Sequence, residues 1–219
     1  MHRKIAKALI IGLMTEALAL TGTVPSFGAQ KALDNNTDNY AEPPAIDSTS
    51  AIIMDAGSGK ILYEKNAYEK RDPASITKIL NCMVVLDTLD MSSEVTVDIE
   101  PESEGSIMNL KKGETLKVKD LVYGMMLWSA NDAAEVLAYA AGGDIDTFCD
   151  MMNERAKACG AKDTAYTNPN GLNDEAVNNV TTAYDLALIA RSAMNNPDFA
   201  KIVGTSKYTI KATNKSGER

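Results

Sequence analysis

Ser75 and Lys78 have the residue types and the spacing of a nucleophile paired with a base. They stand in the stretch ASITK, residues 74–78, with Pro73 just before it and an apolar run behind it. One helical turn places residues three apart on the same face, so the Ser75 hydroxyl and the Lys78 amine would be neighbours. Burial lowers the pKa of a lysine because it disfavours the charged form, and the free amine could then accept the serine proton. The spacing alone occurs by chance in many chains, so a serine nucleophile needs further support.

A second polar pair, Ser129 and Asn131, stands in the stretch WSAND between two predicted helices. At such a break a hydroxyl and a carboxamide can project together, although simple helix capping is the alternative interpretation. His2 is the only histidine of the chain. It lies in a segment that we expect to be removed, so the mature chain would have neither a Ser-His-Asp triad nor a histidine metal site. A serine nucleophile would therefore need Lys78 as its base.

The first residues of the chain predict export. Residues 1–28 have a basic start, an apolar stretch from about residue 8 to residue 20 and small residues after it, which is the pattern of a secretory signal peptide. A buried amphipathic helix is the alternative, and the apolar stretch is short for a membrane span. Residues 29–49 are polar with a Pro-Pro pair and predict a flexible linker. Residues 50–219 are enough for one domain with a core.

Charge and cysteine content exclude several classes of function. The formal net charge is −8, which argues against binding to nucleic acid or to an anionic membrane surface. The three cysteines, Cys82, Cys149 and Cys159, show no C-x-x-C spacing. We interpret them as small buried apolar residues, and Cys149 and Cys159 are too far apart on one predicted helix to form a bridge.

The elements that must position these residues form a mixed α/β pattern. Residues 75–89 are apolar nearly all round and predict a helix in the centre of the domain, which would also leave the Ser75 N–H free to stabilise an oxyanion. Helices packed on an antiparallel sheet are the predicted architecture. The other predicted elements are a hairpin of 51–54 with 60–64, a strand at 94–99, helices at 118–127, 132–140, 144–159 (capped by Asp144) and 184–194 (opened by Thr182 and Asp185), and a strand at 207–212.

Together with ASITK and WSAND, several longer stretches of the chain resemble the D-alanyl-D-alanine carboxypeptidases. These are low-molecular-mass penicillin-binding proteins that share their fold with the serine β-lactamases. The resemblance runs from about Ser50 to Tyr208. The stretches that carry it are AIIMDAGSGKILYEKN, RDPASITK, SEGSIMNLKKGETLKVKDLVYGMMLWSANDAAEVLA, TNPNGLNDE and TTAYDLALIA. Such enzymes combine S-x-x-K with a serine-x-asparagine element and K-T-G.

The resemblance implies a role for each residue of the two pairs. Ser75 would attack the peptide bond between two terminal D-alanines of peptidoglycan stem peptides, with Lys78 as its base. Ser129 would relay a proton to the leaving amine, and Asn131 would hydrogen-bond the substrate backbone. Water would hydrolyse the acyl-enzyme, β-lactam antibiotics would acylate the same serine, and no metal or organic cofactor is implied. The place of action would be outside the cytoplasm, at the cell wall or envelope, and no membrane anchor is visible in the chain.

The chain departs from the family pattern at the third element. Lys215-Ser216-Gly217 resembles K-T-G in spelling, but its surroundings are polar on both sides and predict an exposed turn. We therefore expect the chain to be a fragment that stops before the true element. It would have a sheet incomplete at its C-terminus, and would be inactive as given.

Two alternatives remain open from the sequence. Glu175 stands four residues before Asn179, as a deacylating glutamate does in some β-lactamases, although the surrounding loop resembles the carboxypeptidases. A non-catalytic exported protein that holds wall peptides without cutting them is the second alternative. It rests on the missing K-T-G.

Overall fold

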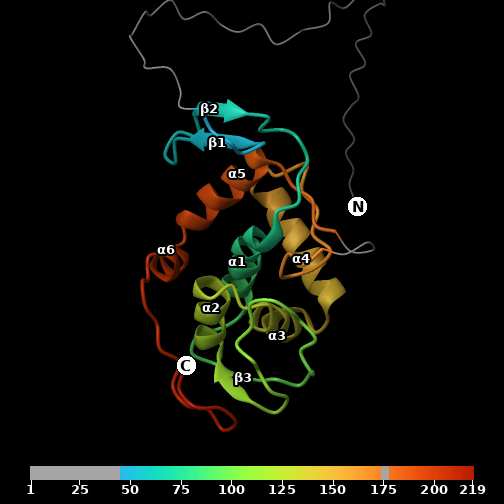
Figure 1. Cartoon of the computed structure of the whole chain (residues 1–219), viewed down its shortest axis with the longest axis vertical. Coiled ribbons are helices and arrows are strands. Elements are labelled where there is room, and N and C mark those ends of the chain that lie inside the picture. The colour runs from blue at the N-terminus through green and yellow to red at the C-terminus, as the bar shows by residue number, and fades with distance from the viewer. Residues whose placement is uncertain (1–44, 174–177) are drawn as a thin grey trace, which may run out of the picture. The chain divides into compact units, whose positions relative to one another are not determined.

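A computed structural model describes residues 45–173 and 178–219 of the chain. The predicted signal peptide, most of the predicted linker and Glu175 lie outside the described residues. The described elements, in chain order, are β1 Ala51–Met54, β2 Ile61–Lys65, the 3₁₀ turn η1 Ala74–Thr77, α1 Lys78–Thr88, β3 Glu94–Thr96, β4 Thr115–Lys117, α2 Val118–Leu127, α3 Asn131–Gly142, α4 Ile145–Ala158, α5 Ala183–Met194 and α6 Pro197–Val203. Figure 1 shows the helices between two small strand pairs, with β1 and β2 beside α5 and β3 beside α2 and α3.

The first strand pair is the predicted hairpin. β1 and β2 are antiparallel, with Ile53 opposite Tyr63. The turn is closed by the Asp55 side chain, which accepts a hydrogen bond from the Ser58 N–H at 2.7 Å, and Gly59 supplies the left-handed residue at φ +76°. The alternating apolar residues of the two strands were therefore sufficient to predict this element.

The second strand pair was only half predicted. β3 ends at Thr96, short of the expected residue 99, and pairs with β4, which the sequence did not indicate. Beyond Thr96 the Val97 N–H still donates to the Glu114 carbonyl at 2.9 Å, and the Val97 carbonyl accepts from the N–H of Gly113, which has φ +77°, at 2.7 Å. A three-residue strand has too little alternation to be recognised before its partner is known.

Helix α1 is the centre of the described fold, as predicted. Figure 1 shows it in the middle of the helices, and it contacts all five of the others. It is apolar nearly all round because it has neighbours on nearly every side. Its fully or almost fully buried apolar residues are Leu80, Cys82, Met83, Val84 and Val85.

Helix caps fix where the later helices begin. The Asp144 carboxylate accepts from the Thr147 N–H at 2.7 Å, and the Thr182 hydroxyl accepts from the Asp185 N–H at 3.0 Å, so both predicted caps are confirmed. Helix α6 was not predicted from the sequence. Pro197 in fact stands in the first turn of α6, where its missing N–H costs nothing, and Asn196 caps the helix.

The strand predicted at residues 207–212 is wrong. This segment lies against α2 as an extended chain, where the Tyr208 ring stacks on Tyr123 at 3.9 Å between centroids and its hydroxyl donates to Asp120 at 2.6 Å. Ile210 exchanges two backbone hydrogen bonds with Arg219 instead of joining a sheet. Among the described residues, no neighbouring strand completes a ladder with this segment.

The cysteines are free thiols, and Cys82 and Cys149 are buried as expected. Burial raises the pKa of each of these two thiols to about 12, which keeps them protonated and unreactive at neutral pH. Cys159 is only half-buried.

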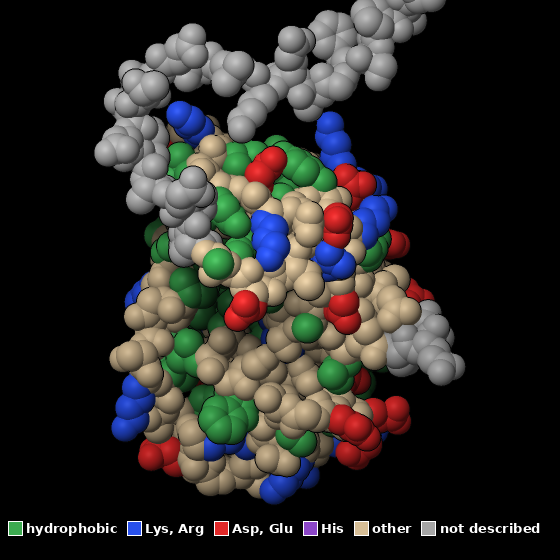
Figure 2. All heavy atoms as spheres, turned by 45° about the horizontal axis from the view of Figure 1, so that its top comes forward, with side chains coloured by type: hydrophobic (Ala, Val, Ile, Leu, Met, Phe, Trp, Pro, Cys, Tyr) green, Lys and Arg blue, Asp and Glu red, His purple; other side chains and the backbone are tan. Residues whose placement is uncertain are grey.

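The surface agrees with the acidic composition. On the face drawn in Figure 2, charged side chains of both signs are interspersed with apolar ones, and acidic side chains gather at the lower right. Within residues 45–173 and 178–219, no helix is both long and apolar enough to cross a bilayer.

Candidate active site

The structure brings the predicted nucleophile and base together. The Lys78 Nζ lies 3.2 Å from the Ser75 Oγ, within hydrogen-bond reach. One detail of the prediction is corrected, because the α-helix begins at Lys78 and Ser75 lies in the 3₁₀ turn before it. The tighter turn still keeps residues three apart on one side. Ser75 is exposed and Lys78 is only 2% exposed, so a substrate could reach the hydroxyl while the amine stays dry.

The backbone before Ser75 has an unusual conformation. Ala74 has φ +46°, in the left-handed region that residues with a Cβ rarely adopt. Two contacts hold it there: the Asp72 carboxylate accepts from the Ala74 N–H at 2.7 Å, and Gly171 packs directly on the Ala74 carbonyl. A Cβ on Gly171 would lie 1.9 Å from that carbonyl oxygen. The Ser75 N–H has no acceptor among the described residues, so it is available as an oxyanion donor, as expected.

Lys78 is desolvated and held by a single backbone carbonyl. Its Nζ donates to the Asn170 carbonyl at 2.6 Å. Burial lowers the pKa of Lys78 to about 8, because the interior disfavours the ammonium form. The amine is thus poised near neutral pH, as a general base must be.

Ser129 and Asn131 lie at the junction of α2 and α3. Ser129 has φ +59°, and the residue that caps α3 is Ala130, which makes no side-chain cap. The capping interpretation of this pair is therefore wrong. The Asn131 Nδ2 donates to the Glu104 carbonyl at 2.6 Å, and its buried Oδ1 has no partner within the described part of the chain. A buried amide oxygen without a donor is costly.

The sequence missed Asp132, the residue that secures this junction. Its buried carboxylate accepts from the Met108 N–H at 2.9 Å and from the Leu110 N–H at 3.0 Å. An acidic residue in the first turn of a helix is usually a response to the helix dipole, so its position gave no signal of this second role. No hydrogen bond between described residues joins Ser129 or Asn131 to Ser75 or Lys78. The two pairs are linked through helix packing, where the Asn81 Nδ2 of α1 donates to the Ala134 carbonyl of α3 at 3.3 Å.

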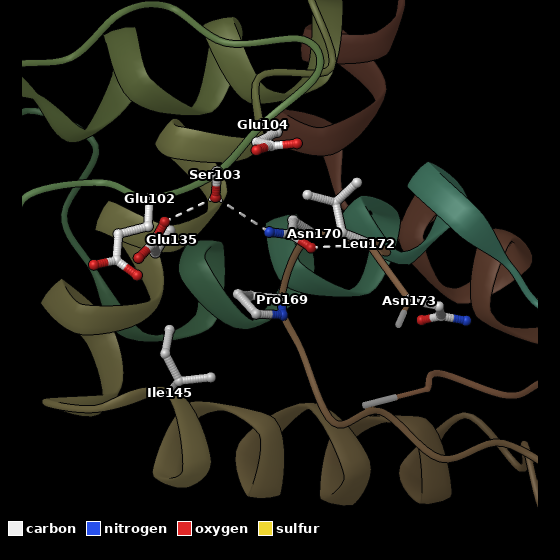
Figure 3. Close-up of a pocket in the computed structure, with 9 residues that line it drawn as sticks. All are labelled: Glu102, Ser103, Glu104, Glu135, Ile145, Pro169, Asn170, Leu172 and Asn173. Carbon is white, nitrogen blue, oxygen red and sulfur yellow. Dashed lines mark hydrogen bonds between the residues drawn. The ribbon is translucent and has the colours of Figure 1, made fainter. Parts of the chain in front are cut away.

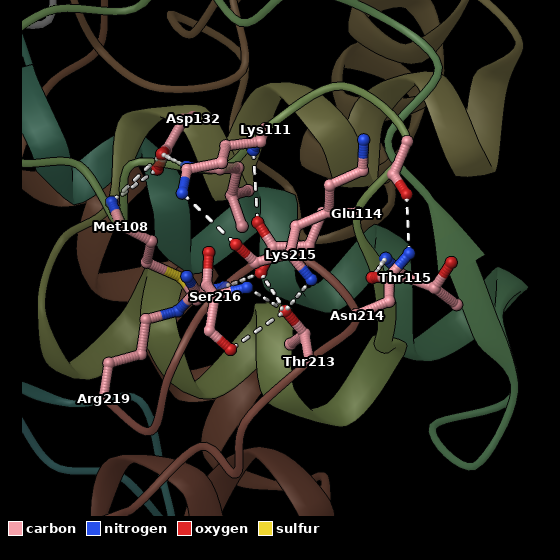
Figure 4. Close-up of polar contacts among 12 residues, drawn as sticks. Met108, Lys111, Glu114, Thr115, Asp132, Thr213, Asn214, Lys215, Ser216 and Arg219 are labelled. Carbon is pink, nitrogen blue, oxygen red and sulfur yellow. Dashed lines mark hydrogen bonds and ion pairs between the residues drawn. The ribbon is translucent and has the colours of Figure 1, made fainter.

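Lys215-Ser216-Gly217 lies outside the helices and strands, with Lys215 and Gly217 exposed and Ser216 half-buried, as predicted for a surface turn. Figure 4 shows the polar contacts around Lys215 and Ser216. This turn sits on the loop before β4: the Lys111 Nζ donates to the Lys215 carbonyl at 3.2 Å. Its anchor is the buried Glu114, which accepts from the Thr213 hydroxyl at 2.6 Å and from the Arg219 Nη2 at 2.7 Å. Burial raises the pKa of Glu114, but these hydrogen bonds outweigh it and hold the pKa below its usual value. The contacts of the triplet are structural and do not involve Ser75.

A cavity of about 470 Å³ lies beside the Asn170 loop (Figure 3). Its wall includes Asn170 itself, whose carbonyl holds Lys78, together with Glu135, whose carboxylate accepts from the Ser103 hydroxyl at 2.8 Å. Burial raises the pKa of Glu135. Ser75 and Lys78 do not line this cavity. In the described residues, no group of three or more histidine, cysteine or acidic side chains could hold a metal ion.

Comparison with known proteins identifies the family. The D-alanyl-D-alanine carboxypeptidase family, peptidase family S11, matches residues 37–218. The chain belongs to this family. It is 32% identical over 209 residues to the D-alanyl-D-alanine carboxypeptidase DacF of Bacillus subtilis, covering 93% of this chain and 51% of the relative. It is 38% identical over 152 residues to DacB2 of Mycobacterium tuberculosis, covering 69% and 52%. The chain thus spans about half the length of these curated relatives.

Solved structures of this DD-peptidase family confirm the predicted fold class. A crystal structure of a D-alanyl-D-alanine carboxypeptidase from Mycobacterium tuberculosis is similar with a TM-score of 0.78 at 33% identity, over 83% of this chain and 68% of the other. A mutant of the Streptomyces K15 DD-transpeptidase is similar with a TM-score of 0.71 at 32% identity, over 81% and 73%. The mixed α/β architecture of the chain is that of the DD-peptidases.

Proposed function

We propose that the protein carrying this chain is a serine-type D-Ala-D-Ala carboxypeptidase that acts on peptidoglycan stem peptides outside the cytoplasm and is acylated by β-lactams. The observation that carries the proposal is the 3.2 Å approach of the buried Lys78 amine to the exposed Ser75 hydroxyl. Family membership supports the substrate class, and the signal-peptide pattern of residues 1–28 supports export.

The geometry suggests how the reaction would begin. The free amine of Lys78 takes the Ser75 proton while Oγ bonds to the carbonyl carbon of the penultimate D-alanine. The resulting oxyanion accepts a hydrogen bond from the Ser75 N–H, which has no other acceptor in the described structure. Collapse expels the terminal D-alanine, whose nitrogen takes the proton that Lys78 removed from Ser75, relayed by the Ser129 hydroxyl. Water then attacks the acyl-enzyme and releases the shortened peptide and the Ser75 hydroxyl.

Asn131 has one atom left for the substrate. Its Nδ2 already donates a hydrogen bond to the Glu104 carbonyl, so the unpartnered Oδ1 would accept a hydrogen bond from a backbone N–H of the substrate. A bound peptide would then satisfy an atom that the described structure leaves unsatisfied.

Mass spectrometry of the penicillin adduct tests the proposal. The full-length protein is incubated with benzylpenicillin, digested, and searched for the mass of an acyl group. We expect the adduct on Ser75, and none in Ser75→Ala, together with release of D-alanine from a D-Ala-D-Ala peptide by the parent. An adduct on another residue would refute the assignment of Ser75. A stable fold with neither an adduct nor D-alanine release would favour the non-catalytic alternative, and rapid turnover of penicillin would favour a β-lactamase.

A further inference from the structure

The turn at residues 168–171 contacts both members of the catalytic pair. Its Asn170 carbonyl accepts from the Lys78 Nζ at 2.6 Å, and its Gly171 lies against the Ala74 carbonyl and the Ser75 nitrogen. The position of this turn therefore determines the orientation of the Lys78 amine and the packing against the backbone of Ser75.

The Asn168 side chain shapes the turn from inside. Its Oδ1 accepts from the Gly171 N–H at 2.7 Å and from the Asn170 N–H at 3.3 Å. These bonds define the local conformation of the turn but do not attach it to α1. Two further side chains attach it: the Asn81 Nδ2 of α1 donates to the Pro169 carbonyl at 3.0 Å, and Asn179 joins the turn to Thr77 at the start of α1.

Asn179 makes the attachment closest to the base. It is 2% exposed, and its Oδ1 accepts from the Thr167 N–H at 2.8 Å and from the Asn168 N–H at 3.1 Å. Its Nδ2 donates to the Asn168 carbonyl at 3.1 Å and to the Thr77 Oγ1 at 3.0 Å. Thr77 is fully buried and directly precedes Lys78, so one side chain joins the turn that carries the acceptor to the residue beside the base.

A primary amide suits this place because it donates and accepts at once. The backbone N–H groups of the turn need an acceptor, whereas the Asn168 carbonyl needs a donor. An apolar side chain would leave these buried groups unpaired, and the turn would move to reach water.

We propose that Asn179 is a positioning residue for the lysine base, which it serves by fixing the turn whose Asn170 carbonyl holds Lys78 Nζ. The inference rests on the proposed function, since it assigns a role in serine acylation. With one amine hydrogen held by the Asn170 carbonyl, rotation of the Lys78 amine is restricted and its lone pair can be directed at the Ser75 hydroxyl. Without Asn179 the Lys78 amine would stay near Ser75, but its lone pair would no longer be held in the direction of the Ser75 hydroxyl.

Acylation kinetics of the full-length protein test this role. A fluorescent penicillin gives three quantities: the limiting acylation rate constant at saturation, the constant for non-covalent association, and the amplitude, which reports the active fraction. For Asn179→Ala we expect the limiting rate constant to fall by about 10- to 100-fold, the scale of an ångström-sized misplacement of a reacting group. The association constant should change by less than about twofold, because Asn179 would not touch the ligand. A purely structural role would lower the amplitude and the melting temperature but not the rate constant of the molecules that fold.

Two further variants make the test decisive. Asn178→Ala is the matched control, since Asn178 is the exposed neighbour of the same type, and it should react like the parent. Thr77→Val keeps the volume of the side chain but removes the bond to Asn179, so its limiting rate constant should fall by a smaller factor, about three- to tenfold. If Asn179→Ala does not fold, Thr77→Val decides the question by the same criterion.

The outcomes separate the two proposals. A parent that is not acylated at Ser75 would refute the proposed function and the inference with it. A parent that is acylated normally, with folded Asn179→Ala or Thr77→Val within about twofold of it, would refute only the role of Asn179. An equal loss in Asn178→Ala would also refute that role, because the effect would then be a general disturbance of the loop.

Discussion

The acylation rate should depend on pH through the buried amine of Lys78. With its pKa lowered to about 8 by burial, about one-tenth of the amines are uncharged at pH 7. An ordinary lysine with a pKa near 10.5 would have about one in 3,000 uncharged, so burial raises the concentration of working base by about 300-fold. We expect the rate to rise about tenfold per pH unit between pH 6 and pH 7 and to level off above about pH 8.

The assay is the limiting rate of acylation by a fluorescent penicillin, measured from pH 5.5 to pH 9.5 at constant ionic strength. Lys78→Ala should abolish the rise with pH and lower the rate at pH 8 by about 10²- to 10⁴-fold, the usual range for loss of a general base. Its fold should persist, because the core of α1 is made by apolar residues such as Leu80 and Val84. Lys70→Ala is the matched control, since the Lys70 side chain is 61% exposed. A rate that is flat from pH 6 to pH 8, or a Lys78→Ala variant within threefold of the parent, would refute the role of Lys78.

The same burial has a signature in stability. The pKa of Lys78 is lower in the folded chain than in the unfolded chain, so the unfolded chain binds more protons between pH 8 and pH 10.5. Folding therefore carries the full cost of burying this group below about pH 8, and that cost disappears as the pH rises toward 10.5. The free energy of unfolding of the parent, relative to Lys78→Met, should rise by up to about 3 kcal/mol across this window. A constant difference between the two proteins would show that Lys78 is hydrated.

Two substitutions near the site should separate its support from its chemistry. Gly171→Ala should slow acylation by at least about 100-fold and lower the melting temperature, because its Cβ would meet the Ala74 carbonyl at 1.9 Å and its φ of +86° favours glycine; an acylation rate equal to that of the parent would show that this backbone contact is not needed. Asp132→Asn should cost about 1–3 kcal/mol in urea unfolding, because one of the oxygens that receive the Met108 and Leu110 N–H groups becomes a donor. A free energy of unfolding unchanged within 0.5 kcal/mol, on the scale of ordinary surface substitutions, would contradict the assigned role of Asp132.

The sequence predicted the elements whose signals are local. The capping residues Asp144 and Thr182 predicted the starts of their helices. The apolar pattern on nearly all sides of residues 75–89 predicted a central helix. The pair Ser75 and Lys78 was predicted for the same reason, because three residues of separation fix a distance within one turn. The start of α1 was placed three residues early, since a 3₁₀ turn and an α-helical turn have the same composition.

What the sequence did not reveal depends on contacts between distant segments. β4 becomes a strand by pairing with β3, whereas residues 207–212 join neither of the sheets in the described part of the chain. Neither outcome is encoded within the segment itself. The Asn170 carbonyl was missed because a backbone oxygen has no sequence signature, and Asn179 was noticed only for its spacing from Glu175. Its contacts to Thr77 and Asn168 arise from the fold.

Asn170, the acceptor of Lys78, lies 92 positions after it in the chain, and this separation also sets a time at which the chain can become reactive. A ribosome that adds about 5–20 residues per second needs roughly 5–20 s to synthesise the stretch between them. During that interval Lys78 is a hydrated, protonated lysine, and the serine three residues away is an ordinary hydroxyl. A nascent or unfolded chain would therefore not react with penicillin and would carry no label. Covalent labelling of Ser75 would count only those molecules in which the turn at residues 168–171 and Asn179 have docked, which makes the antibiotic a probe of folding around the site.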